Sequence, residues 1–114
     1  MEDAQALALF DEILARTKEG RIPWEPSVSD TLLAAIKGKR SLVLMPARAD
    51  SWGNERYSPS LTVRDSFDRE LLRVTDEIEG VRLEALHELY DTARRQAFKV
   101  EEQVQDLLTD LKNL

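Results

Sequence analysis

The residue best suited to acid–base chemistry is His87, the single histidine of the chain. It lies three residues after Glu84 and four before Asp91, so on a helix either carboxylate could orient the imidazole as a base. Arg94 lies three residues after Asp91 and could form a bidentate pair with a carboxylate. No serine or cysteine nucleophile is visibly paired with the histidine, so a surface position at a helix edge is the simpler interpretation.

Six of the 22 acidic residues lie in two short runs, 65–70 and 76–79. A calcium loop needs oxygen ligands at alternating positions around a sharp glycine turn and a distant bidentate glutamate, and neither run has this pattern. Cysteine is absent, which excludes thiolate metal sites and disulfides. No phosphate-cradling or dinucleotide fingerprint occurs. The sequence therefore predicts no catalytic, cofactor-binding or metal residue and no cofactor.

Basic residues concentrate at one short stretch of the chain, where Lys37, Lys39 and Arg40 surround Gly38. They could hold a phosphate or an acidic loop, but a solvated turn is the commoner use of such residues. The whole chain has 16 basic and 22 acidic residues and a net charge of −6. Because nucleic-acid binding requires basic residues that replace counterions on phosphate, the balance argues against a nucleic-acid partner.

Exposed aromatic residues are expected in the turn-rich segment 49–59. Trp52 and Tyr57 are flanked there by Arg48 and Arg56, a composition typical of interface hot spots. A small local core is the competing interpretation of the same residues. The other tryptophan, Trp24, lies between two prolines and is expected to cover the edge of the sheet.

The last third of the chain carries the clearest pattern. From residue 81 onward apolar residues follow one another at separations of three and four: Leu83, Leu86, Tyr90, Ala93, Ala97, Val100, Val104, Leu107, Leu111 and Leu114. This heptad register predicts one helix over 81–113, about 50 Å long at 1.5 Å per residue. A break near Phe98–Lys99, or a helix folded wholly onto its own domain, are the alternatives. If the helix projects, its interface candidates are Val100, Val104, Leu107, Leu108 and Leu111.

The preceding elements are a helix and a small sheet. Apolar residues at three-to-four spacing predict a helix over 3–19, which ends at Gly20. Segments 31–36 and 41–48 are typical of a hairpin, and 61–64 and 70–74 of two further strands. The predicted fold class is α+β: a single domain over 1–114, with an antiparallel meander of about four strands over 31–74 and a long C-terminal helix.

Both ends of the chain resemble small uncharacterised bacterial proteins. The stretch "LFDEILARTKEGRIPWE" is similar to their N-terminal helix and following tryptophan segment, and "LHELYDTARRQAFKVEEQVQDLLTDL" to their C-terminal helix. The resemblance implies an order of helix, short β-meander and long helix. It transfers no activity and no site residue.

Hydropathy, the N-terminal residues and the absence of cysteine bear on the location of the protein. No window approaches 18 consecutive apolar residues, the N-terminus lacks a basic signal-peptide region, and cysteine is absent, so we expect a cytoplasmic protein without a membrane partner. We expect a non-enzymatic interaction module, a small bacterial adaptor, regulator or immunity-type binder whose partner is a protein or itself. Homodimerisation through residues 97–114 is its specific form. The alternative is a small enzyme or ligand-binding domain with a pocket between sheet and long helix, using His87, Asp91 and Arg94.

Overall fold

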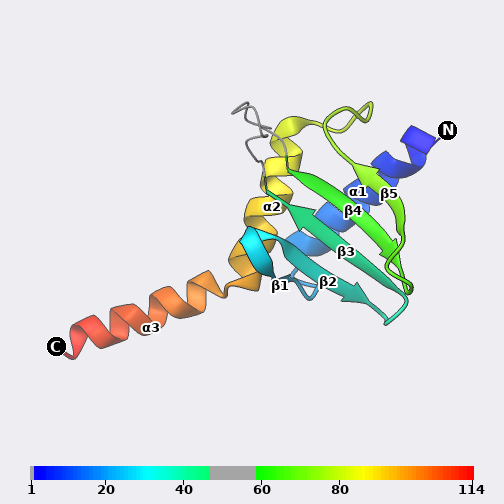
Figure 1. Ribbon diagram of the computed structural model, residues 1–114. Helices are drawn as coiled ribbons and strands as arrows, with labels where there is room; N and C mark the ends of the chain where they lie inside the picture. The colour runs from blue at the N-terminus through cyan, green and yellow to red at the C-terminus, as the bar shows by residue number, and fades with distance from the viewer. Residues whose placement is uncertain (1, 47–58) are drawn as a thin grey trace, which may run out of the picture.

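Two helices cover one face of an antiparallel sheet, and a third helix extends away from it (Figure 1). The computed structural model describes residues 2–46 and 59–114. In chain order the elements are α1 (Glu2–Lys18), β1 (Glu25–Pro26), the 3-10 turn η1 (Val28–Asp30), β2 (Leu32–Ile36), β3 (Arg40–Met45), β4 (Ser60–Asp65), β5 (Glu70–Val74), α2 (Leu83–Ala97) and α3 (Val100–Lys112). The α+β class and the order of helix, meander and helix are confirmed.

The sheet has five strands in the order β1-β2-β3-β4-β5, one more than the predicted four. The additional strand is β1, in which Glu25 pairs with Leu33 and Pro26 with Leu32. Proline lacks a backbone donor, so Pro26 is compatible with the edge of the sheet, where β1 lies. The two-residue length of β1 explains why no strand pattern marked it in the sequence.

The hairpin between β2 and β3 forms because Lys37 and Gly38 both adopt positive φ, at 54° and 70°. The Lys39 backbone N–H donates to the carbonyl of Ile36 over 3.1 Å and closes the turn. Two consecutive residues with positive φ match the twist of the flanking strands. Alternate residues then face the helices, and Leu32, Leu44, Leu61 and Val74 form one cross-strand row of the core.

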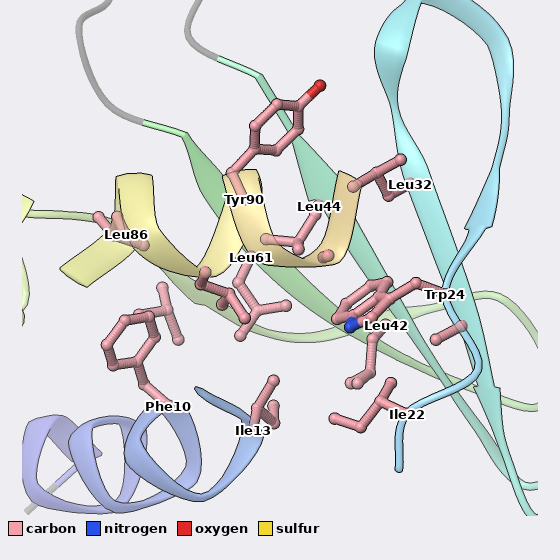
Figure 2. Close-up of a cluster of buried hydrophobic side chains, with 14 of the residues drawn as sticks. Phe10, Ile13, Ile22, Trp24, Leu32, Leu42, Leu44, Leu61, Leu86 and Tyr90 are labelled. Atoms are coloured by element: carbon pink, nitrogen blue, oxygen red, sulfur yellow. The ribbon is translucent and has the colours of Figure 1, made fainter. Parts of the chain in front are cut away.

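Helix α1 packs on the sheet through its predicted apolar stripe. Ala6, Phe10, Ile13 and Thr17 are all buried, and Gly20 follows the helix with a φ of 74°. Phe10 and Ile13 meet the sheet leucines and Leu86 of α2 in the core (Figure 2). The predicted helix over 3–19 is therefore confirmed to within one residue at each end.

Trp24 and Tyr90 fasten the segment around β1 to the helices. The Trp24 indole Nε1–H donates to Thr17 Oγ1 over 3.0 Å, and the ring is buried in the core (Figure 2). The Tyr90 hydroxyl donates to the carbonyl of Asp30 over 2.5 Å. Burial and then the negative charge of Asp30 raise the pKa of the Tyr90 phenol above its ordinary value of 10.0. Both polar groups are thus paired where burial would otherwise penalise them.

The C-terminal third contains two helices, so the prediction of one continuous helix over 81–113 is wrong. Phe98 ends α2, and Lys99 adopts φ 53° and ψ 48° before α3 begins at Val100. A left-handed residue cannot continue a right-handed helix, so the two helices take different directions. Apolar spacing reports which face of a segment is apolar, but it does not report the backbone conformation of one residue. The break lies at the alternative position, Phe98–Lys99.

Candidate protein-interaction site

Helix α3 presents an apolar stripe that the described part of the chain leaves uncovered. The exposed fractions are 51% for Val104, 57% for Leu107, 45% for Leu108 and 54% for Leu111. Val100, at the base of the helix, is partly buried. Spacing of three and four residues places these side chains on one side of α3. Four of the five helix residues predicted as interface candidates are therefore exposed, and they lie together.

Helix α3 projects from the sheet and from α1 and α2, and its direction changes at the junction of Phe98 and Lys99. The helix extends away from the sheet and ends at the C-terminus far from the body (Figure 1), and the longest dimension of the molecule is 58 Å. Across the junction, Arg95 Nη2 lies 2.8 Å from Glu101 Oε1, and Gln103 Nε2 donates to the carbonyl of Phe98. These contacts are exposed, so the direction of α3 depends on surface interactions and on the conformation of Lys99.

The polar side of α3 is acidic. Within residues 100–112 it carries four carboxylates, Glu101, Glu102, Asp106 and Asp110, and one cation, Lys112, so its charge is −4 + 1 = −3. A hydrogen bond from the Arg95 side chain lowers the pKa of Glu101 below its ordinary value of 4.5. The helix therefore offers an apolar stripe bordered by negative charge, which a surface with an apolar centre and a basic rim would complement.

Arg94 lies at the base of α3. Its guanidinium carbon is 5.2 Å from the centroid of the Phe98 ring, within cation–π range. Arg94, Phe98 and Val104 line a surface hollow of about 420 Å³ at this junction. This predicted pocket residue therefore belongs to the α2–α3 junction.

His87 and Asp91 lie elsewhere, on the side of α2 that faces solvent. Both are exposed, and they line a shallow hollow of about 630 Å³ whose lining residues all come from segment 82–91. Leu86, Leu89 and Tyr90 take up the side of α2 that faces the core. The expectation of a pocket between sheet and helix lined by His87, Asp91 and Arg94 is therefore corrected. The helical rotation that buries the leucines turns the histidine outward.

A groove that the sequence does not reveal lies between α1 and the sheet. We call it the α1–sheet groove; it has a volume of about 560 Å³, and its apolar lining includes Leu9, Ile13, Ile36, Leu42, Val63 and Leu72. Arg16, Arg21, Arg40 and Glu12 also line it. The lining residues come from α1, the segment after it and four strands, so no local motif could have marked the groove. The one hint was the adjacent pair Leu71 and Leu72 in β5, where strict alternation would place a single apolar residue.

The acidic run 65–70 forms a turn. Asp65 Oδ1 accepts hydrogen bonds from the backbone N–H groups of Phe67 and Arg69, and its Oδ2 accepts one from Arg69 Nε at 2.8 Å. These bonds, with the backbone N–H of Arg69 contributing most, lower the pKa of Asp65 below its ordinary value of 3.8. Across residues 2–46 and 59–114, no group of three or more histidine and carboxylate side chains could hold a metal ion.

Three interface candidates from the long connection, Arg48, Trp52 and Tyr57, lie outside the described residues. Within the described parts, none of the helices combines the length and the apolar character needed to cross a membrane.

No family model matches the chain, and no curated protein or solved structure shows significant similarity to it. Three features of the described surface could bind a partner: α3, the α2–α3 junction and the α1–sheet groove.

Proposed function

We propose that this protein is a non-enzymatic interaction module that binds a protein partner through α3. The observation that carries the proposal is the exposed stripe of Val104, Leu107, Leu108 and Leu111 on a helix that projects from the body. In this proposal the protein acts in the cytoplasm as a small adaptor, regulator or immunity-type binder, and α3 is its binding surface. Association with a second copy is the specific form that the following subsection develops.

Helix α3 is too short to be stable without packing. A helix of 13 residues has little stability in water by itself, and most helices in proteins are stabilised by packing of their apolar side. Fully burying one leucine contributes roughly 1.5–3 kcal/mol, so each half-exposed leucine of α3 retains about half of that for a partner. Covering the stripe would therefore stabilise both the complex and the helix itself.

The spacing of the stripe indicates the mode of binding. Val104, Leu107, Leu108 and Leu111 occupy positions i, i+3, i+4 and i+7 of one helix. This is the anchor pattern of an amphipathic helix that lies in an apolar groove. Because the flanking side chains are acidic, the groove of the partner should have a basic rim.

A matched pair of glutamate variants tests the proposal. Leu107→Glu places a carboxylate in the stripe, whereas Gln105→Glu adds the same charge to the polar side of α3. We expect Leu107→Glu to weaken self-association in sedimentation velocity by about tenfold or more, and to reduce co-purification of any partner protein with the full chain to the same degree. Gln105→Glu should preserve both. If the Leu107→Glu chain retains every association of the unaltered chain, α3 is not the binding surface.

A further inference from the structure

The α1–sheet groove is an incompletely covered part of the face on which the helices lie. Helix α2 contacts β1 and β2, and α1 contacts β5. Residues of α1, the segment after it and the strands line the groove, and none of α2 does. There Leu9, Ile36 and Leu72 are only partly buried, and Leu71 is 54% exposed. The groove thus lies beside α1 where another helix could cover apolar side chains of the sheet.

We infer that this groove receives α3 of a second copy of the chain, an inference that rests on the proposed function of α3. The groove is lined by residues of β2, β3, β4 and β5, whose axes span about 14 Å at roughly 4.8 Å per strand. Helix α3 has 13 residues and is about 20 Å long. One α3 helix is therefore long enough to cross the exposed width of the groove.

Charge complementarity favours this occupant. Three arginines and one glutamate line the groove, Arg16, Arg21, Arg40 and Glu12, which gives +3 − 1 = +2. Arg16 pairs with Glu12 and Glu19, and Arg21 pairs with Glu19, so including Glu19 reduces the local charge to +3 − 2 = +1. Arg40 has no ion-pair partner among the described residues. The −3 charge of α3 meets this rim, whereas two α3 helices paired with each other would bring two acidic surfaces together.

The chain connectivity permits a reciprocal exchange. Gln96 at the end of α2 donates through Nε2 to the carbonyl of Thr17 over 2.6 Å, and Arg16 of the groove is the adjacent residue of α1. The base of α3 and one end of the groove therefore both lie near the C-terminal end of α1. Because α3 points away from its own body (Figure 1), two copies can each supply a helix to the other. Such an exchange closes into a dimer with two identical contacts, so it does not extend into a filament.

Complementation between two variants of the full chain tests the inference. Leu107→Glu impairs the helix that enters the groove, and Leu71→Glu impairs the groove. Leu71 is exposed in the free chain, so the second substitution should leave the fold intact, which circular dichroism checks. Leu33→Glu is the matched control, because Leu33 is an exposed strand leucine on the opposite face of the sheet.

We expect Leu107→Glu and Leu71→Glu each to weaken self-association by about tenfold or more, since either places a carboxylate in an apolar contact. Leu33→Glu should leave it unchanged. An equimolar mixture of the two impaired variants should recover a heterodimer, because the intact α3 of one copy fits the intact groove of the other. Arg40→Glu should weaken association in the same direction, and more strongly at low salt.

The outcomes separate this inference from the proposed function. If Leu71→Glu associates as the unaltered chain does while Leu107→Glu does not, α3 binds another surface; the groove inference fails and the proposed function stands. If the mixture recovers nothing, reciprocal exchange is overturned. An unaltered chain that stays monomeric up to high micromolar concentration also overturns it, whether α3 is free or folds onto its own groove. If Leu107→Glu changes no association of any kind, both proposals fail.

Discussion

Helices α2 and α3 share one apolar pattern, but the apolar side chains of α2 are buried and those of α3 are not. In α2 the stripe of Leu86, Leu89, Tyr90, Ala93 and Ala97 is buried against the body. In α3 the continuation of the same heptad register has no buried residue. The two segments are separated by Phe98 and Lys99 alone. An apolar stripe therefore shows that a helix has a side to bury, but not which surface will cover it.

The difference arises at the junction. The left-handed Lys99 gives α3 its own direction, and the Arg95–Glu101 pair bridges the two helices from the exposed side. Burial in α2 and exposure in α3 are thus consequences of position relative to the sheet. Neither composition nor periodicity distinguishes the two helices.

The largest expected contrast is between equivalent leucines of the two stripes. Leu86→Ala in α2 should lower the free energy of unfolding by about 2–5 kcal/mol, because it leaves a cavity in the core. Leu107→Ala in α3 should change it by less than about 0.5 kcal/mol in dilute solution. Urea denaturation measures both. If the two substitutions cost the same amount at low concentration, α3 is packed on its own body and the contrast is mistaken.

The junction can be tested by a change whose sign differs between one helix and two. Lys99→Gly relieves a left-handed conformation that disfavours side chains, so we expect unfolding free energy to rise by about 0.5–1 kcal/mol. If α2 and α3 were fused in solution, the same glycine would interrupt a helix and destabilise it by about 1 kcal/mol. Urea denaturation followed by circular dichroism distinguishes the two signs. Thr109→Gly, inside α3, controls for the effect of glycine in a helix.

The smallest expected effect concerns the ion pair across the junction. The hydrogen bond from Arg95 lowers the pKa of Glu101 in the folded chain below 4.5. Stability from this pairing is therefore fully present above the unfolded pKa, and it is lost as the pH falls through the folded value. NMR titration of the Glu101 carboxyl should show the low pKa, and Arg95→Gln should return it towards 4.5. Arg82→Gln, a matched change elsewhere before α2, should leave it unaltered; an unshifted Glu101 in the native chain would show that the pair does not form.

Helix α1 and the β2–β3 hairpin could be predicted from the sequence, because each is set by the residue types within one short segment. The apolar residues at three-to-four spacing, among them Ala6, Phe10 and Ile13, predicted α1, and the apolar segments 31–36 and 41–48 predicted the β2–β3 hairpin. Strand β1 was not predicted, since two residues carry no periodicity; the sequence indicated only that Trp24 covers the edge of the sheet. The site was predicted less completely: the apolar residues of α3 were named, but the groove beside α1 was not.

The sequence by itself determined the order of helix, antiparallel strands and helix, the acidic charge and the apolar residues of α3, because each depends on residue type and short-range spacing. Only the tertiary structure showed that His87 and Asp91 face solvent and that the C-terminal helix is interrupted at Lys99. It alone also showed that Arg40 lines the apolar groove beside α1. The physical reason is that burial is a relation between segments distant in the chain. Which stripe is covered and which stays free depends on where the sheet ends, and no spacing within one helix contains that distance.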